Sequence, residues 1–201
     1  MKTILHLISS PRQESSFSIK LGRAIVAQLQ DKYPDSVVNE VNLIQENFPH
    51  LDAAHLQSFY TPKESLTAAD LEAIRYSDHA INQLFEADFI VIGAPLYNFS
   101  IHSALKAWID HIARAGLTFR YSEHGPEGLV KDKKVYIAMS AGGVYSEGPY
   151  QPYDFVVPYL KAVLGFMGMT DLTVYRAEGV NIPDLKEHAL EKAIDSIALA
   201  G

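Results

Sequence analysis

The apolar residues of the chain form five short runs separated by stretches with a different spacing. Runs of this length and composition are typical of strands that are covered on both faces of a sheet. They cover residues 3–8, 37–43, 88–93, 134–140 and 172–175, of which 37–43 alternates in part between apolar and polar residues. The stretches between them place apolar side chains at helical spacing, so strands and helices alternate along the chain. This alternation predicts a parallel sheet with helices on both faces.

The spacing predicts five helices, each following one of the runs. They are expected at residues 16–33, 67–86, 103–114, 155–166 and 185–200. Thr67 with Asp70 three residues later resembles a capping box, with Asp in place of Glu. Two longer connections, 44–66 and 115–133, are predicted to be irregular, and connections this long are usually functional or contact a partner. No repeat or low-complexity linker interrupts the 201 residues, which predicts one domain, residues 1–201.

Composition excludes several classes of function. The chain has a formal net charge of -7, which argues against binding to nucleic acid or to an anionic membrane surface. It contains no cysteine, which excludes disulfides, thiolate metal sites, iron–sulfur clusters and a cysteine nucleophile. No apolar run approaches the roughly 20 residues of a membrane span, and no secretory signal precedes the first strand, so we expect a cytoplasmic protein.

Common catalytic motifs are missing as well. The eight histidines show no metal-ligand spacing, so no metal site is expected. Ser140 lacks the glycine pattern of a hydrolase nucleophile. No side chain is predicted to be catalytic in its own right. Parallel sheets of this kind bind ligands beyond the carboxyl ends of their strands, so the loops after the first, third and fourth strands decide the function.

The loop after the first strand is rich in hydroxyl groups. Dinucleotide folds and P-loops carry glycines at this place, and none is present here. Instead, five serines surround the start of a helix, whose free N–H groups and dipole favour an anion. Hydroxyl and amide donors suit a terminal phosphate monoester, for which Ser10, Ser16 and Ser18 are the best candidates. Ordinary helix capping by Ser15 or Ser16 explains the pattern equally well.

The loop after the third strand is aromatic and apolar. Leu96, Tyr97 and Phe99 at a strand exit are unfavourable unless something flat covers them. Pro95 fixes the direction of the chain, and the Asn98 amide can pair with the edge of a heterocycle. These features favour a planar ring as the ligand. Packing of the aromatics against a neighbouring loop is the alternative.

The loop after the fourth strand contains Gly142 and Gly143, preceded by Ser140 and Ala141. Adjacent glycines allow the backbone to approach a ligand closely, with N–H groups directed at its polar edge. A plain turn is the commoner meaning of such a pair. The joint placement of the three loops at one edge of the sheet favours the ligand-binding interpretation.

Six stretches spread over nearly the whole chain resemble the bacterial FMN-dependent NADH azoreductases, also called NADH:quinone reductases. They are S-S-P-R at 9–12 with S-F-S at 16–18, A-P-L-Y-N-F at 94–99, A-G-L-T-F-R-Y at 115–121, G-P-E-G-L at 125–129, S-A-G-G at 140–143 and L-G-F-M-G-M-T-D at 164–171. The resemblance implies a flavodoxin-like three-layer fold, with a five-stranded parallel sheet in the order 2-1-3-4-5.

The resemblance also implies the residues that bind tightly held FMN. In the family the serine group holds the phosphate, one segment runs along the isoalloxazine, and the glycine turn meets the other polar edge of the ring. The corresponding residues are Ser10, Ser16, Phe17 and Ser18 for the phosphate, Pro95, Leu96, Tyr97, Asn98 and Phe99 for the ring, and Ser140, Ala141, Gly142 and Gly143 for its polar edge. The chain departs from the family twice: relatives often have Met at Leu96 and Arg at Ala141.

The implied reaction is a ping-pong cycle in which the flavin supplies the chemistry. NADH or NADPH delivers hydride to the flavin and leaves, and a quinone or azo compound then takes two electrons in the same pocket. The amides of Gly142 and Gly143 are expected to stabilise negative charge at the flavin edge. The family also implies a homodimer, in which Phe119, Tyr121 and Phe166 line the acceptor pocket, partly across the interface. Core packing is the alternative role for these aromatics.

Two other functions fit the same topology. A flavodoxin-like electron carrier would pass single electrons to a protein partner without turning over a small molecule. The long connections at 44–66 and 119–129 favour a covered substrate pocket instead. A receiver domain would need acidic residues after the first strand, where Ser9 and Ser10 stand.

Overall fold

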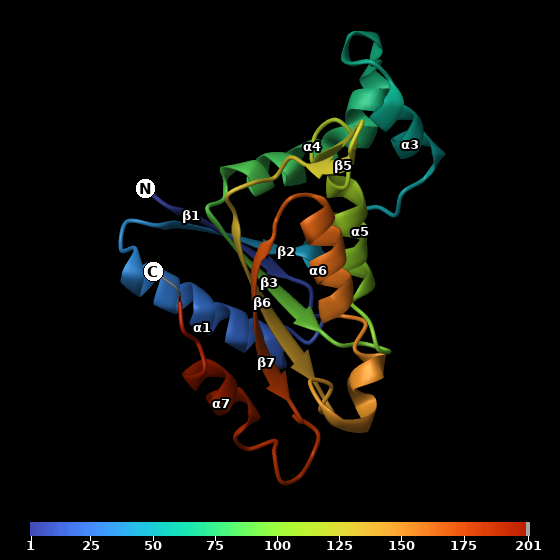
Figure 1. Cartoon of the computed structure of the whole chain (residues 1–201). Helices are drawn as coiled ribbons and strands as arrows, with labels where there is room; N and C mark the ends of the chain where they lie inside the picture. The colour runs from blue at the N-terminus through green and yellow to red at the C-terminus, as the bar shows by residue number, and fades with distance from the viewer. Residues whose placement is uncertain (200–201) are drawn as a thin grey trace.

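A five-stranded, fully parallel sheet forms the centre of the computed structural model, which describes residues 1–199 (Figure 1). Its strands lie in the order β2-β1-β3-β6-β7. They are β1 (Thr3–Ile8), β2 (Val37–Asn42), β3 (Phe89–Pro95), β6 (Lys134–Ala141) and β7 (Asp171–Glu178). All four neighbouring pairs are parallel, so the carboxyl ends of the strands meet at one edge of the sheet, as the sequence predicted.

Helices cover both faces of this sheet. On one face α1 (Phe17–Lys32) and α7 (Ala189–Asp195) pack against one set of strand side chains, which includes Ile4. On the other face α4 (Ala68–Glu86), α5 (Ser103–Ile112) and α6 (Val157–Phe166) pack against the alternate set, which includes Leu5. Successive residues of a strand point to opposite faces, so each apolar run contributes to two cores at once. The predicted three-layer arrangement is confirmed.

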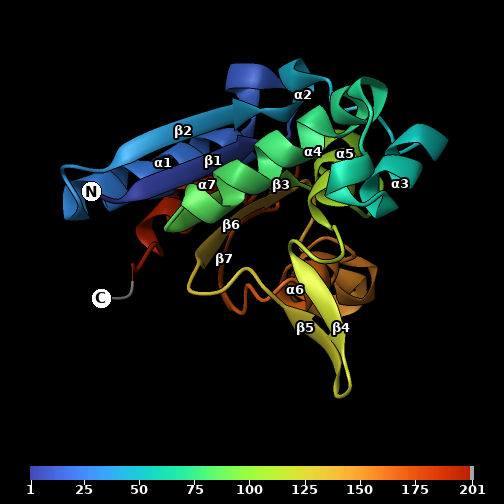
Figure 2. The same cartoon turned by 90° about the horizontal axis from the view of Figure 1, so that it is seen from above.

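The predicted strand order 2-1-3-4-5 needs a correction. Two further strands, β4 (Phe119–Ser122) and β5 (Gly125–Gly128), precede β6 and form a separate antiparallel hairpin. The main sheet therefore has the order β2-β1-β3-β6-β7 in the numbering of all strands. The hairpin projects from the body beside α6 (Figure 2). Its strands are four residues long, and β5 consists of two glycines, a proline and a glutamate, so neither strand carries an apolar pattern long enough to identify it.

The connection at 44–66 is more ordered than predicted. It contains α2 (Leu43–Glu46), α3 (Ala53–Tyr60) and a 3-10 turn at Lys63–Ser65. The helix α3 begins with a capping box between Asp52 and His55, in which histidine takes the place of the usual Glu or Gln, so the sequence signal was hidden. It lies beside the first half of α4, at the end away from the sheet (Figure 1).

The starts of two predicted helices can be compared with the structure. The capping box of Thr67 and Asp70 at the start of α4 is confirmed. The closing helix is shorter than the predicted 185–200, because turns occupy the stretch up to His188 and α7 begins only at Ala189. The end of that prediction, residue 200, lies outside the described residues. None of the helices within residues 1–199 has the length and apolar character that crossing a bilayer requires.

Candidate functional site

The serine loop leaves the first turn of α1 without a side-chain cap. Ser16 is the N-cap residue, but its hydroxyl makes no capping hydrogen bond and lies 3.0 Å from the hydroxyl of Ser18. Both residues are buried. The hydroxyl of Ser15 donates to the Arg12 carbonyl instead of to α1. The two buried hydroxyls and the N–H groups of the first turn therefore face no capping partner, which is the arrangement that an anion satisfies.

Ser10 and Arg12 extend this polar group. The Ser10 hydroxyl accepts a hydrogen bond from the Arg12 N–H over 3.3 Å, and it lies 3.5 Å from the hydroxyl of Tyr97. The first loop is thus joined to the second. Arg12 was missed by the sequence reasoning, although a cation beside a serine-rich helix start was a visible signal. Its guanidinium is suited to a phosphate because it offers several donors in one plane.

The loop after β3 makes a tight turn at the same edge. The backbones of Tyr97 and Ser100 exchange two hydrogen bonds, of 2.8 and 2.9 Å. The two residues between them, Asn98 and Phe99, have positive φ angles of 48° and 69°, a backbone conformation that costs energy for residues other than glycine. The turn is held in place by the Leu96 N–H, which donates to the Ser140 carbonyl. The second and third loops are therefore directly connected.

The loop after β6 directs its backbone donors away from β7. The carbonyl groups of Ala141, Gly142 and Gly143 accept hydrogen bonds of 2.9 to 3.3 Å from the N–H groups of residues 179–181. A trans peptide unit points its carbonyl and its N–H in opposite directions, and residues 1–199 contain no cis peptide bond. The N–H groups of Gly142 and Gly143 therefore point away from residues 179–181.

Gly142 lies close to the side chain of Asn181. A Cβ atom at position 142 would lie 2.6 Å from the side-chain nitrogen of Asn181, so a larger residue there would force the Asn181 amide to move. Asn181 is a second residue that the sequence reasoning missed, since it follows β7 and only three strands were considered. At Gly143 a Cβ would meet the Tyr145 ring at 3.3 Å, a tight contact that a shift of the ring relieves.

The three loops enclose a cavity of about 230 Å³. It is lined by Arg12, Ser16, Phe17, Pro95, Leu96, Tyr97, Ser140, Ala141, Gly142, Val180 and Asn181. Eight of these were predicted from the sequence to bind the cofactor. Of the other five predicted residues, Ser10 and Ser18 contact lining residues, Asn98 and Gly143 directly follow lining residues in the chain, and Phe99 follows Asn98. Arg12 is the one charged residue in this lining.

Asn98 lies against a second, larger hollow, which shares Tyr97 with the first cavity. This hollow of about 680 Å³ also contains His102, Lys106 and Tyr159. Burial lowers the pKa of His102 below its usual value of 6.5, and it raises the pKa of Tyr159 to about 12. The Nδ1 atom of His102 accepts the N–H of Ala104 at the start of α5. His102 is therefore neutral near pH 7 and serves as a helix cap.

The aromatic residues predicted to line the acceptor pocket lie together but outside the cavity. Phe119 on β4 packs against Phe166 at the end of α6, with ring centres 4.5 Å apart, and against Tyr121 at 5.7 Å. We call these three residues the aromatic cluster. Tyr121 is 74% exposed and Phe166 is 37% exposed, so they are not ordinary core residues. Within the single chain the aromatic cluster does not line the cavity.

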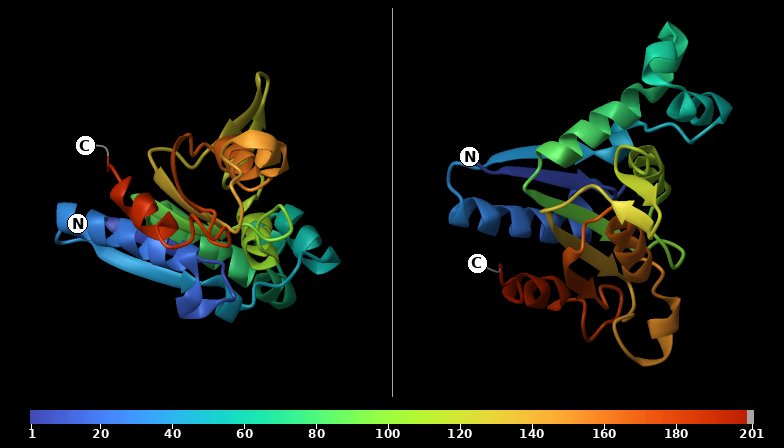
Figure 3. Two further views of the ribbon diagram at one scale, coloured as in Figure 1. Left: turned by 90° about the horizontal axis from the view of Figure 1, so that it is seen from below. Right: turned by 45° about the horizontal axis from the view of Figure 1, so that its top comes forward.

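No metal site competes with this cavity. Within residues 1–199, no group of three or more His, Asp or Glu side chains is arranged to hold a metal ion. The buried histidines His6 and His111 serve structural contacts: the first lies 3.0 Å from a Glu40 oxygen and the second 2.9 Å from the Pro49 carbonyl. The sheet topology and the loops at its carboxyl edge, seen from two further directions in Figure 3, define an α/β protein of the flavodoxin-like class.

Comparison with known proteins agrees with this class and narrows it. Residues 2–199 match the family model described as flavodoxin-like fold. An FMN-dependent NADH:quinone oxidoreductase of Herminiimonas arsenicoxydans is 48% identical over 180 residues, which cover 90% of this chain and 88% of that protein. Another FMN-dependent NADH:quinone oxidoreductase, from Rhizobium etli, is 45% identical over the whole length of both.

Solved structures agree as well. An azoreductase from Bacillus anthracis str. Sterne superposes with a TM-score of 0.90 at 33% identity, covering 97% of this chain and 96% of that one. An FMN-dependent NADH-azoreductase from Bacillus anthracis str. Ames Ancestor, determined in complex with FMN, gives 0.86 at 26% identity, covering 98% and 97%. This chain belongs to the family of FMN-dependent NADH:quinone oxidoreductases and azoreductases.

Proposed function

We propose that the cavity between the three loops binds FMN and that the protein uses NADH to reduce quinones and azo compounds there. The chain is an FMN-dependent oxidoreductase by its family. The observation that carries the location of the cofactor is the uncapped start of α1, where two buried serine hydroxyls face no capping partner. A phosphate monoester supplies the acceptor oxygens that these donors need.

The polar end of the cavity fits the phosphate of FMN. Ser10, Ser16 and Ser18 offer hydroxyl donors, the first turn of α1 offers N–H groups, and Arg12 offers the single positive charge. Charge-assisted hydrogen bonds of this kind are about twice as strong as neutral ones. Phe17 lines the cavity beside this polar group and packs against the apolar core. Binding by these residues would fix the cofactor at one end.

The remaining lining fits the ring. Pro95, Leu96 and Tyr97 supply one part of the lining, and the backbone of Ser140 to Gly142, which lies beside them at the paired ends of β3 and β6, supplies another. FMN bound here would supply the chemistry of hydride and electron transfer between NADH and the acceptor. The N–H groups of Gly142 and Gly143 are suited to stabilise negative charge at the polar edge of the ring. Ala141 has no side chain long enough to reach the ring, so at this position only the backbone contributes.

We infer a ping-pong order for the two substrates because both must reach the same cavity. NADH gives up one hydride, which amounts to one proton and two electrons. A quinone takes up two electrons and two protons. The second proton comes from solvent, since Arg12 is the one charged residue in the lining and its guanidinium does not release a proton in proteins. The side chains therefore bind and orient the substrates, and no general acid is assigned among them.

The exposed aromatic cluster supports the further proposal of a homodimer. A cluster of exposed aromatic side chains favours contact with a substrate or a second chain. In a dimer, Phe119, Tyr121 and Phe166 of one protomer would cover the cavity of its partner and form the acceptor pocket. We also propose that the chain acts as one domain, residues 1–201, in the cytoplasm, without binding nucleic acid or membrane.

Purified protein tests these proposals against the rival function of an electron carrier. The account predicts a yellow protein that retains FMN and oxidises NADH or NADPH with both a quinone and an azo dye as acceptors. Initial rates at varied concentrations of both substrates should give parallel double-reciprocal lines. A protein that binds FMN but turns over neither acceptor would support the carrier. A colourless protein that takes up no FMN would contradict the whole proposal.

A further inference from the structure

A buried carboxylate holds the segment that follows the glycine turn. Glu178 ends β7, and one of its carboxylate oxygens accepts the N–H of Tyr145 over 3.0 Å. Its other oxygen accepts the N–H of Ser146 over 3.3 Å. The side chain of Glu178 is only 9% exposed. The chain directly after Gly143 is thus attached to β7 by charge-assisted hydrogen bonds, which are stronger than neutral ones.

A second buried carboxylate holds the other end of the same segment. One oxygen of Asp154 accepts the N–H groups of both Val156 and Val157, each over 3.0 Å. Val157 is the first residue of α6, so Asp154 satisfies backbone donors at the start of this helix. The side chain of Asp154 is 5% exposed. Residues 145–157 therefore begin and end on a carboxylate that is largely shielded from water.

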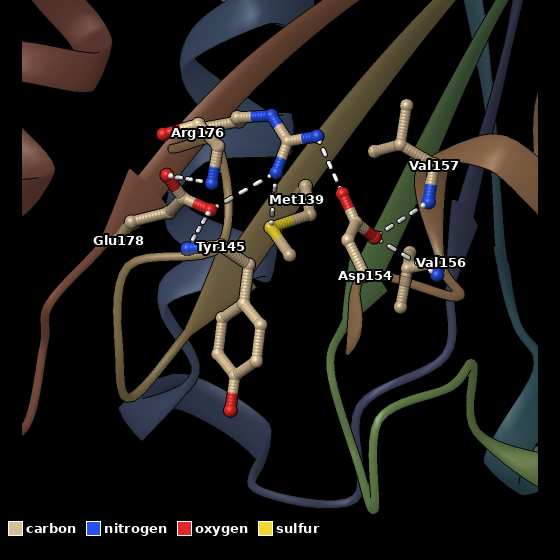
Figure 4. A network of polar contacts seen from close by, with 8 residues as sticks. Met139, Tyr145, Asp154, Val156, Val157, Arg176 and Glu178 are labelled. Carbon is tan, nitrogen blue, oxygen red and sulfur yellow. Dashed lines mark hydrogen bonds and ion pairs between the residues drawn. The ribbon is translucent and has the colours of Figure 1, made fainter. Parts of the chain in front are cut away.

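One guanidinium joins these two carboxylates (Figure 4). Arg176 lies two residues before Glu178 on the same face of β7 and donates to it over 2.9 Å. Its other terminal nitrogen, Nη2, donates to Asp154 over 2.6 Å. The sulfur atom of Met139 on β6 lies 3.8 Å from Nη1 of Arg176. The planar fork of arginine can serve two carboxylates at once, which an ammonium group does less well. Two buried negative charges in proximity depend on such a partner.

The segment that Arg176 holds contacts two of the three loops around the cavity. The Tyr145 ring lies next to Gly143, close enough to touch a Cβ there. At the far end, the N–H of Phe155 donates to the carbonyl of Phe99 over 3.1 Å, and the ring of Tyr153 lies 5.5 Å from the Phe99 ring. Arg176 itself does not line the cavity, so its effect on a bound group must pass through these two loops.

We propose that Arg176 is a positioning residue for the flavin ring. By pairing with Asp154 and Glu178 it fixes residues 145–157, and these hold the glycine turn and the Phe99 turn at the spacing that the ring requires. The proposal rests on the proposed function, since it assumes that FMN occupies the cavity. It assigns to Arg176 an effect on the electronic properties of the ring as well as on the order of the segment, because displaced N–H groups at Gly142 and Gly143 would stabilise the reduced ring less well.

The test compares Arg176→Met and Arg176→Lys with the unmutated full chain. Amide hydrogen exchange of the FMN-free chains should accelerate at residues 145–157 by about ten- to a hundredfold in Arg176→Met, the range expected when a charge-assisted hydrogen bond is lost. The FMN dissociation constant should rise by about tenfold or more, and the reduction potential of the bound FMN should fall. Arg176→Lys should recover part of each effect, and it carries the test if Arg176→Met does not fold.

Lys134→Met is the matched control. Lys134 pairs with Asp171 across the same two strands at their opposite end, so its loss should change none of the three readings at the cavity. Faster exchange with unchanged affinity and potential would overturn the proposal, because Arg176 would then order the segment without acting on the flavin. Unchanged exchange would overturn it too. Failure of the unmutated chain to take up FMN would overturn the proposed function first, and that failure is recognisable because it needs no substitution.

Discussion

The cavity and the aromatic cluster differ in how completely a single chain encloses them. The cavity lies where the carboxyl ends of β1, β3 and β6 meet, and Ser16, Ser18 and Ala141 there are buried. The aromatic cluster lies on the β4–β5 hairpin and the end of α6, where Tyr121 is largely exposed to solvent and Phe166 is partly exposed. The parallel sheet brings distant segments together by itself, whereas the hairpin extends beyond the core.

This difference separates two kinds of function. A site built at the strand ends is rigid, because each loop is anchored in a strand that is paired on both sides. A site on a projecting hairpin depends on what covers it. The contrast favours a division in which the cavity holds the cofactor and the aromatic cluster receives the changing substrate. The following substitutions test this division, beginning with the largest expected effect.

Gly128→Val should displace the aromatic cluster. A Cβ at Gly128 would lie 2.1 Å from the backbone nitrogen of Gly168, and backbone cannot move aside as a flexible side chain can. We expect the free energy of unfolding to fall by about 3 kcal/mol, the upper end of the range for overpacking. Denaturant titration measures it. Gly165→Ala on α6 is the control, because no atom lies near its Cβ position, and a similar loss there would contradict the account.

Replacing both Ser16 and Ser18 by alanine should damage the cavity and leave the hairpin intact. The loss of hydroxyl donors to a charged phosphate should raise the FMN dissociation constant by about ten- to a hundredfold. Quenching of flavin fluorescence on titration with protein measures the change. Ser122→Ala, which removes a serine from the hairpin, should bind FMN as the unmutated chain does. If the double variant also bound FMN normally, the phosphate would have to lie elsewhere.

Phe166→Ala should impair binding of the acceptor and leave binding of FMN intact. We expect the KM for a quinone to rise by about tenfold, as for the loss of one buried aromatic contact, while FMN affinity stays unchanged. Steady-state kinetics and the same fluorescence titration separate the two. Phe85→Ala serves as the control, since Phe85 is exposed to a similar degree, 42%, on α4. Loss of FMN affinity in Phe166→Ala would show that the two regions are one site.

The smallest expected effect concerns His102, whose pKa is lowered by burial from 6.5. The unfolded chain then binds the proton more tightly than the folded protein, so His102 contributes stability above pH 6.5 that is lost as the pH falls toward its folded pKa. Protonation of Nδ1 would also remove the cap on α5. His102→Asn, which keeps a capping side chain, should therefore lose less stability than the unmutated chain between pH 7.5 and 5.5 in denaturant titrations. An equal loss in both would contradict this role.

The centre of the sheet could be predicted because β1, β3 and β6 are apolar on both faces. The stretch now seen as β3 is buried at every position, and such a run allows few other interpretations. The hairpin and α3 were missed for a physical reason. The strands β4 and β5 are short and partly exposed, and α3 begins with an Asp–His capping pair. Neither element is specified by burial, and periodicity therefore could not reveal it.

In the candidate site, the residues of the three loops were mostly predicted, whereas two other lining residues were missed. Serine hydroxyls, the aromatic turn and the paired glycines can be recognised from individual residues in the sequence. Eight of the thirteen predicted cofactor-binding residues line the cavity. Arg12 and Asn181 were missed because their importance comes from position: one reaches the cavity from the serine loop, and the other follows β7. The contact of Gly142 with Asn181 joins residues 39 positions apart, which no local pattern can show.

Comparison of FMN with riboflavin, which lacks only the phosphate, tests the central claim most directly. Equilibrium titrations of the flavin-free chain with each ligand, followed by flavin fluorescence, measure the contribution of the serine loop. The account predicts that FMN binds at least about a hundredfold more tightly than riboflavin, as expected for two or more charge-assisted hydrogen bonds. It also predicts that the preference largely disappears when Ser16 and Ser18 are both alanine. Equal affinity for the two ligands in the unmutated chain would contradict it.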